Sequence, residues 1–75
     1  MGKNKSYPGD RFFPAGDYDN IYYIELGDGV ERPIPFNNND NPLMAAELFV
    51  AREQISRANI EQIRKFLSDN TKGKQ

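Results

Sequence analysis

Residues 20–36 carry the most regular pattern of apolar and polar positions in the chain. Two runs rich in Ile, Tyr and Pro stand on either side of a Gly-Asp-Gly triplet at positions 27–29, and these are turn-forming residues. In the first run Tyr22 and Ile24 would point to one face and Tyr23 to the other, because successive residues in a strand point to opposite sides. The pattern predicts an antiparallel β-hairpin.

The length of the hairpin loop decides which side chains share a face. A two-residue turn at Asp28-Gly29 would put Tyr23 on the side of Ile34, whereas a three-residue loop with Gly29 in the left-handed region would align Tyr22 with Ile34. We favour the three-residue loop because it gathers the more apolar positions of both strands on one face. That face comprises Tyr22, Ile24, Leu26, Val30, Arg32 and Ile34. The opposite, outer face comprises Ile21, Tyr23, Glu25, Glu31, Pro33 and Pro35.

Two prolines constrain the second strand of this hairpin. Pro33 and Pro35 have no N–H group, and residues two apart direct their backbone groups to the same edge of a strand. Positions 30, 32 and 34 must therefore bond to the first strand. The second strand is expected to be an edge strand that resists further pairing.

The polar stretch at residues 37–41 reads as the entry to a helix. The side-chain oxygen of Asn41 can accept hydrogen bonds from the first turn, and Pro42 fits the first helical position, where its missing N–H is not needed. Asp40 suits the positive end of the helix dipole. We expect the helix to run from Pro42 to about Gln54. Its expected core-facing side chains are Met44, Ala45, Leu48, Phe49 and Ala51.

A second helix is predicted over residues 57–69, with Ser56 as its cap. Glu61 and Lys65 stand four residues apart in the favourable order for an ion pair. Asn70 and Gly73 offer places where the helix can stop. Its expected apolar stripe is Ile60, Ile63, Phe66 and Leu67.

The predicted fold class is therefore α+β, with an antiparallel hairpin or small sheet followed by two α-helices packed on one face. Residues 1–10 are polar and contain Gly and Pro, so we expect a disordered tail or added residues there. Residues 11–14 could form a short first strand, and the domain is expected to span residues 11–73.

Composition excludes several classes of function. The 75 residues contain no Cys and no His, which removes thiol and imidazole catalysis and the common zinc sites. We expect no metal, no cofactor and no enzyme activity. Lys plus Arg number 10 against 11 Asp plus Glu, so nothing favours nucleic acid, and no run is apolar enough to enter a membrane.

The charges are unevenly distributed along this nearly neutral chain. Between residues 10 and 31 Arg11 is the one basic residue. The acidic residues of that segment are Asp10, Asp17, Asp19, Glu25, Asp28 and Glu31. A partner with a basic surface would prefer this half of the chain.

Several local motifs resemble one known family. The predicted hairpin ends in "PFN", and the stretches "DNPLMAAELFV" and "IEQIRKFLSDNTKG" follow it, with the small pair Ala45-Ala46 and Gln62 among them. Together they resemble the PFU domain, the ubiquitin-binding module of phospholipase A2-activating protein and its fungal relatives. The resemblance covers about residues 18–73.

The resemblance implies a non-catalytic, monomeric receptor for ubiquitin in a ubiquitin-dependent degradation or extraction adaptor. It places the domain in the cytoplasm, with the nucleus as a second compartment. It also implies that an AAA ATPase is engaged only through other domains of the parent protein. The chain departs from the family at Leu43, where a large aromatic is usual, and at Asn59. These departures motivate an alternative, a scaffold module that docks neighbouring domains without binding ubiquitin.

The outer face of the hairpin is the candidate contact surface. Ubiquitin's usual recognition surface is apolar with basic residues around it, so a complementary surface should be apolar with an acidic rim. Ile21, Tyr23, Pro33 and Pro35 would supply the apolar part, and Glu25, Asp28 and Glu31 the rim. The competing interpretation is that Ile21 and Tyr23 pack under residues 11–14. The adjacent Phe12 and Phe13 are a second candidate contact pair, but we favour the interpretation that one is buried and the other covers a sheet edge.

Overall fold

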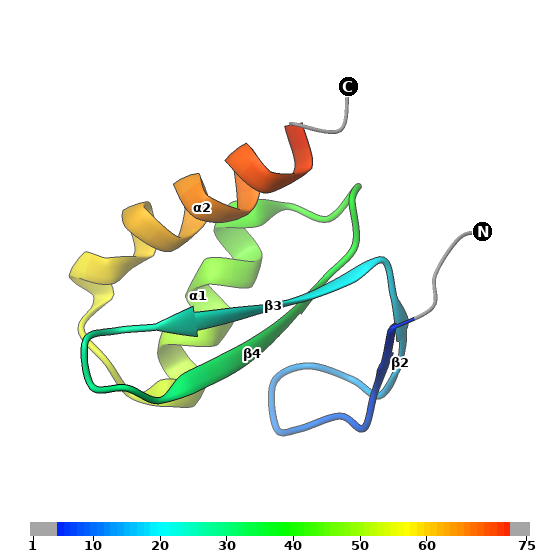
Figure 1. The fold of residues 1–75 in the computed structure, drawn as a ribbon, viewed down its shortest axis with the longest axis horizontal. Coiled ribbons are helices and arrows are strands. Elements are labelled where there is room, and N and C mark those ends of the chain that lie inside the picture. Colours follow the sequence, from blue (N-terminus) through cyan, green and yellow to red (C-terminus); the bar gives the residue numbers. More distant parts are fainter. Residues whose placement is uncertain (1–4, 73–75) are drawn as a thin grey trace. The chain divides into compact units, whose positions relative to one another are not determined.

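The computed structural model describes residues 5–72 and confirms the α+β class (Figure 1). The chain divides into two compact units, one ending at Asn37 and the other beginning at Asn38. The first unit holds β1 (Lys5–Tyr7), β2 (Gly16–Tyr18), β3 (Asn20–Glu25) and β4 (Glu31–Phe36). The second unit holds α1 (Pro42–Glu53), the 3₁₀ turn η1 (Arg57–Asn59) and α2 (Ile60–Lys72). Packing of both helices on one face of the hairpin stays a prediction.

The N-terminal segment is more ordered than the sequence predicts. Lys5–Tyr7 pairs antiparallel with Gly16–Tyr18, where the sequence analysis expects a tail up to residue 10; residues 1–4 lie outside the described part of the chain. The buried rings of Tyr7 and Tyr18 meet edge to face, with centroids 6.1 Å apart. This aromatic contact explains the order, because such pairs stabilise beyond the area they bury.

Residues 11–13 form bends, and Pro14 is irregular, where a short strand is predicted. The carboxylate of Asp10 accepts hydrogen bonds from the backbone N–H groups of Phe12 and Phe13, both at 2.8 Å, and one from the Tyr7 hydroxyl. These bonds hold residues 10–13 in a turn, because an Asp side chain competes with strand pairing for nearby amides. Phe13 is buried and Phe12 is partly exposed, so one of the two aromatics lies in the core as expected.

The β3–β4 hairpin has the register predicted for the three-residue loop. Tyr22 lies opposite Ile34 and Ile24 opposite Arg32, while Gly29 has a positive φ of 80°. At the open end of the hairpin the side-chain oxygen of Asn37 accepts a hydrogen bond from the Asp19 N–H at 3.0 Å. Buried Phe36 and the Asn37 bond give the "PFN" motif a structural role in closing the hairpin.

Burial in the first unit follows the inner face of β4. Ile34 and Phe36 are fully buried, and the Tyr22 ring lies 6.5 Å from that of Phe36. Burial raises the pKa of the Tyr22 hydroxyl, and the nearby Asp19 carboxylate adds to the rise. The tyrosine is therefore neutral across the physiological range.

Helix α1 begins as predicted. Asn41 has extended backbone geometry, and its Oδ1 accepts from the N–H groups of Leu43 at 2.9 Å and Met44 at 3.4 Å. Pro42 occupies the first helical position, and the helix ends at Glu53, with Gln54 left-handed at its C-cap. The asparagine-rich stretch is thus a helix entry and not a spacer.

The buried stripe of α1 differs from the prediction. Ala45 and Phe49 are buried as expected, but Met44 and Ala51 are exposed and Leu48 is partly exposed. Ala46 and Val50 are buried in their place. Apolar residues occur on every side of this helix, so the sequence pattern could not fix which side is buried.

Helix α2 confirms most of its predicted stripe. Ser56 caps the first turn by accepting from the Ala58 N–H at 3.1 Å, but that turn is the 3₁₀ segment Arg57–Asn59. Three stripe residues are buried, Ile60, Ile63 and Leu67. Phe66 is instead 38% exposed. The helix continues past Asn70, and Gly73 lies outside the described residues.

The predicted Glu61–Lys65 ion pair does not form. Glu61 pairs with Arg64, one turn along the helix, and Lys65 pairs with Asp69 at 3.3 Å. Arg57 lies 3.9 Å from Glu47 of α1. These exposed pairs indicate an ordinary solvated helix surface.

Removing the Asn41 cap should destabilise the domain. We expect Asn41→Ala to lower the free energy of unfolding by about 1 kcal/mol, because two first-turn N–H groups lose their acceptor. Urea unfolding followed by circular dichroism measures the change. Asn39→Ala, the same substitution at an exposed position before the helix, is the control and should change stability by less than about 0.5 kcal/mol. Equal losses in the two variants would contradict the capping role.

The two phenylalanines of the helical unit should differ in their contribution to stability. Phe49 is 0% exposed, so Phe49→Ala should cost about 3–5 kcal/mol through lost burial and the cavity left behind. Phe66→Ala deletes the same atoms from a side chain that is 38% exposed and should cost clearly less. Thermal unfolding of both variants in parallel tests the ranking, and a larger loss for Phe66→Ala would refute it.

Candidate functional site

The outer face of the β3–β4 hairpin contains three cross-strand pairs. Its residues, defined here as the hairpin outer face, pair as Ile21 with Pro35, Tyr23 with Pro33, and Glu25 with Glu31. The predicted site residues of both strands thus lie side by side. The face changes along its length from apolar pairs to a pair of carboxylates at the end next to the turn.

The side chains of the hairpin outer face differ in how far they are exposed to solvent. Tyr23 is 58% exposed, and Ile21 and Pro33 are partly exposed. Pro35 is fully buried, so it cannot belong to an exposed contact surface as the sequence analysis expects. It follows directly after fully buried Ile34, and β4 becomes buried on both sides toward its end. The alternation of residues along the strand does not predict the burial of Pro35, because it shows which face a side chain lies on and not whether other residues cover that face.

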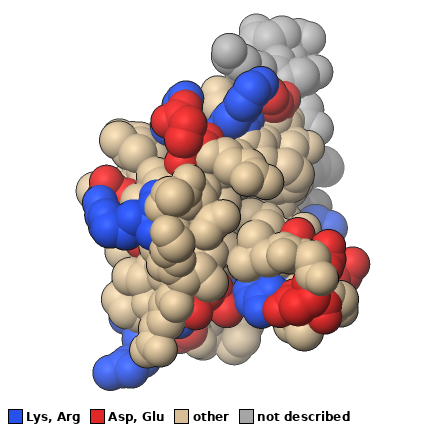
Figure 2. All heavy atoms as spheres, turned by 90° about the vertical axis from the view of Figure 1, so that its left-hand side faces the viewer, with Lys and Arg blue, Asp and Glu red and all other residues tan. Residues whose placement is uncertain are grey.

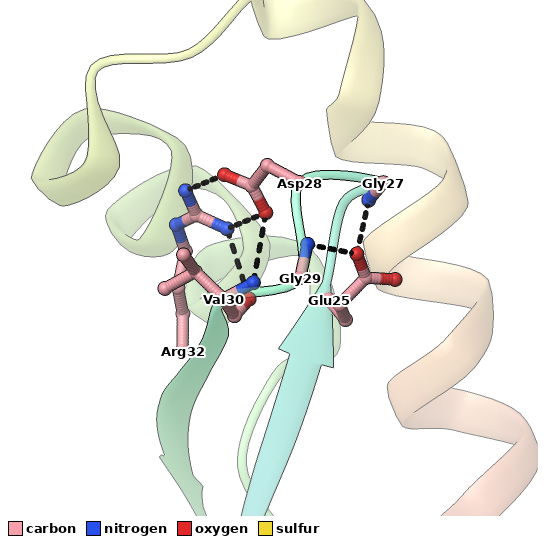
Figure 3. A network of polar contacts seen from close by, with 6 residues as sticks. All are labelled: Glu25, Gly27, Asp28, Gly29, Val30 and Arg32. Atoms are coloured by element: carbon pink, nitrogen blue, oxygen red, sulfur yellow. Dashed lines mark hydrogen bonds and ion pairs between the residues drawn. The ribbon is translucent and has the colours of Figure 1, made fainter.

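The carboxylate of Glu25 is bound to the hairpin turn. Its Oε2 accepts hydrogen bonds from the N–H groups of Gly27 at 2.7 Å and Gly29 at 2.6 Å (Figure 3). Both glycines have positive φ, which the loop needs and which glycine adopts without a steric penalty. Glu25 therefore shapes the turn as well as contributing negative charge.

Asp28 and Arg32 form a bidentate ion pair. Arg32 Nη2 lies 2.6 Å from Asp28 Oδ2, and Nη1 lies 3.2 Å from Oδ1, which also accepts from the Val30 N–H at 3.1 Å (Figure 3). These hydrogen bonds lower the pKa of the Asp28 carboxyl from 3.8 to about 2. Because the pKa is lowered on folding, the ion pair stabilises the hairpin above pH 3.8 and loses this effect as the pH falls through about 2. Since Arg32 already neutralises Asp28, this residue is the weakest of the three predicted rim charges.

Glu31 is the most available carboxylate of the rim. It is exposed and lies directly opposite Glu25. Within residues 5–72 neither Glu25 nor Glu31 forms an ion pair with a basic side chain. Two like charges directly opposite each other destabilise a strand pair. Figure 2, seen from the side on which the hairpin turn lies in Figure 1, shows a group of acidic side chains with a basic one among them.

A second exposed apolar group lies on α1, and part of it is predicted from the sequence pattern to face the core. Leu43 is 42% exposed and Met44 is 56% exposed, and exposed Ala51 lies seven residues after Met44. In a helix this spacing places Met44 and Ala51 on one face. Asp40 before the helix and Glu47 within it supply nearby acidic residues. The signal in the sequence is a helix with apolar residues on all sides, which is unusual unless one side meets a partner.

Between residues 5 and 72 no group of three or more Asp or Glu is arranged to hold a metal ion. Neither described helix is long and apolar enough to cross a membrane. What the geometry offers is a small surface for noncovalent contact, with apolar side chains beside uncompensated carboxylates.

The chain is similar to three characterised proteins over most of its length. It is 28% identical over 74 residues to the ubiquitin homeostasis protein lub1 of Schizosaccharomyces pombe, and 26% identical over 73 residues to phospholipase A-2-activating protein of Xenopus laevis. It is 33% identical over 64 residues to protein DOA1 of Saccharomyces cerevisiae. These alignments cover 97%, 96% and 81% of this chain, but only 10%, 9% and 9% of the relatives.

The family comparison covers every residue. The model of the PFU family, described as PLAA family ubiquitin binding, matches residues 1–75, whereas the sequence pattern predicts a domain over residues 11–73. The motifs "PFN" and "DNP" have structural roles in closing the hairpin and starting α1, so the resemblance rests on residues that determine the fold. The chain belongs to the PFU family of ubiquitin-binding domains.

Proposed function

We propose that this domain binds ubiquitin noncovalently, without catalysing a reaction, and that the hairpin outer face is the contact surface. Membership of a ubiquitin-binding family and the name of the fission yeast relative support a ubiquitin-related role. The observation that carries the proposed surface is Tyr23, which is 58% exposed next to the uncompensated Glu25 and Glu31. An apolar surface ringed by basic residues, as ubiquitin has, complements this arrangement.

The members of the proposed site contribute unequally. Tyr23 is the anchor, because exposed tyrosines supply a large contact area at low cost in conformational entropy. Ile21 and Pro33 flank it, and Glu25 and Glu31 provide the acidic end. Asp28 contributes through the shape of the turn more than through charge, since Arg32 holds it. Pro35 is buried, so it contributes to the packing of β4 and not to the contact surface.

The small size of the surface implies weak binding. A single exposed aromatic with two partly exposed neighbours is far less than the roughly 800 Å² per partner that stable interfaces bury. We therefore expect fast exchange between free and bound forms, which suits an adaptor that must release its cargo. In the parent protein other domains would engage the AAA ATPase of the extraction pathway, and the isolated domain would be a monomer in the cytoplasm or nucleus.

A scaffold function is the second candidate, and the exposed apolar side of α1 favours it. Leu43 and Met44 present more apolar surface than a short solvent-exposed helix needs. In a longer chain this side could dock a neighbouring domain. The relatives are about ten times longer than this chain, so such neighbours exist in them.

Substituting Tyr23 tests whether ubiquitin contacts the hairpin outer face or the exposed side of α1. Tyr23→Ser should weaken ubiquitin binding by about fivefold or more, because an anchor at the centre of a small interface is worth at least about 1 kcal/mol. The matched control is Met44→Ser, at a residue with nearly equal exposure, 56% against 58%, on α1. Titration of the ¹⁵N-labelled domain with ubiquitin, followed by amide chemical shifts, gives both affinities. Loss of binding in Met44→Ser with none in Tyr23→Ser would move the site to α1.

Charge at the acidic end should govern the salt dependence of binding. Glu31→Gln removes an exposed carboxylate with no basic partner among residues 5–72, so affinity at low ionic strength should fall about two- to threefold. The difference from the wild-type domain should shrink at 0.5 M salt, because exposed charges are screened. Asp69→Asn on α2 is the control and should leave affinity unchanged. Equal affinities for wild type and Glu31→Gln at low salt would remove Glu31 from the site.

A further inference from the structure

The two edges of the β3–β4 hairpin differ in their ability to accept another strand. On β4, Pro33 and Pro35 occupy the positions whose backbone groups point away from β3. Neither has an N–H, so this edge offers acceptors but no donors at those positions. An added strand could not complete its hydrogen bonds there.

The outer edge of β3 has no such block. Pro33 lies opposite Tyr23 and cannot donate to it, so this pair is of the type in which both residues direct their backbone groups outward. Ile21 and Glu25, two residues away on each side, have the same orientation. No third strand joins the sheet in the described part of the chain, and no further hydrogen bond occupies these three backbone positions. The edge therefore presents unpaired N–H and C=O groups at alternate residues.

The side chains along this edge specify what would fit beside it. Tyr23 is exposed and would pack against an apolar or β-branched side chain on a neighbouring strand. Glu25 carries a negative charge that Glu31, directly opposite, repels, and neither has a basic partner among residues 5–72. A Lys or Arg beside Glu25 would relieve that repulsion. Charge complementarity thus selects a basic segment.

We propose that the outer edge of β3 is a binding site for an extended basic peptide segment, which adds to the hairpin as an antiparallel third strand. The antiparallel direction is the more stable pairing, and it lets a residue opposite Tyr23 exchange two hydrogen bonds with it. The segment carries an apolar residue opposite Tyr23 and a basic residue two positions away, opposite Glu25. Backbone bonds supply affinity and these two side chains supply selectivity, as in other strand-addition complexes. The site shares the side chains of Tyr23 and Glu25 with the proposed ubiquitin contact and adds the outward backbone groups of β3. The peptide titration contains no ubiquitin, so it tests this site separately from the proposed function.

A synthetic peptide tests the site directly. The probe is acetyl-Arg-Thr-Val-Thr-Arg-amide, whose side-chain symmetry puts Val opposite Tyr23 and an Arg opposite Glu25. Titrated at millimolar concentration into the ¹⁵N-labelled chain, it should shift the amide resonances of Ile21, Tyr23 and Glu25. Replacing both Arg by Glu should remove these shifts. Shifts confined to other residues, or none, would overturn the proposal.

N-methylation of the probe distinguishes strand addition from contact by side chains alone. In the proposed register the Val N–H bonds to β3 while the two Thr N–H groups point away. Methylating the Val nitrogen should therefore abolish binding, whereas methylating both Thr nitrogens should leave it within about twofold. Equal effects of the two modifications would overturn the antiparallel strand.

A substitution in the protein tests the charge that selects the peptide. Glu25→Gln keeps an oxygen that can accept from Gly27 and Gly29, so the turn should persist. Affinity for the Arg probe should fall about two- to fivefold, the usual range for a cross-strand charge pair. The unchanged amide spectrum of the turn serves as the check on folding, and undiminished affinity in a folded Glu25→Gln would remove Glu25 from the site.

Discussion

The backbone pairing of β3 with β4 is the constraint on which the functional surface depends. A hairpin register shifted by one residue would send every side chain of one strand to the opposite face. Here Pro33 and Pro35 can lie only where no N–H is needed, and the Gly27–Gly29 turn has the length that matches this placement. Two independent features of the sequence thus impose the same register. This register places Tyr23 on the outer face of the hairpin, beside its acidic end.

The polar network at the turn supports the same register from the other end. Glu25 binds the amides of Gly27 and Gly29, and Asp28 binds Arg32 and the Val30 N–H. Each carboxylate satisfies turn amides that would otherwise depend on water. The cost is a high density of negative charge on a small hairpin. Of the four charged side chains at this end, Arg32 is paired with Asp28. Within residues 5–72 no basic side chain therefore neutralises the negative charges of Glu25 and Glu31.

Local chemistry in the sequence predicted the features that depend on a few neighbouring residues. The hairpin register, the Asn41 cap and the first position of Pro42 follow from backbone rules that act over short distances. The same reasoning missed the β1–β2 pair, because three-residue strands have too few positions to show a period, and their order depends on the contact between Tyr7 and Tyr18. It also missed which side of α1 is buried. A helix with apolar residues all round gives no directional signal, and tertiary packing decides the side.

The sequence predicts which residues lie on the candidate surface but not how far each of them is exposed to solvent. Cross-strand partners follow from the register, so the pairs Tyr23 with Pro33 and Glu25 with Glu31 are predictable from the sequence alone. The burial of Pro35 and the ion pair between Asp28 and Arg32 are not predictable in this way, because both depend on the three-dimensional surroundings. The exposed Leu43 and Met44 on α1 likewise emerged only from the structure. They form a second exposed apolar group, with Asp40 and Glu47 nearby in the sequence.

Cross-saturation from unlabelled ubiquitin to the deuterated, ¹⁵N-labelled domain tests the central claim most directly, since it reports proximity and not a change in conformation. The account predicts saturation transfer to the amides of Ile21, Tyr23 and Glu31 on the hairpin outer face, with little transfer to Leu43 or Met44. Transfer concentrated at the first turn of α1, with none on the hairpin, would contradict it.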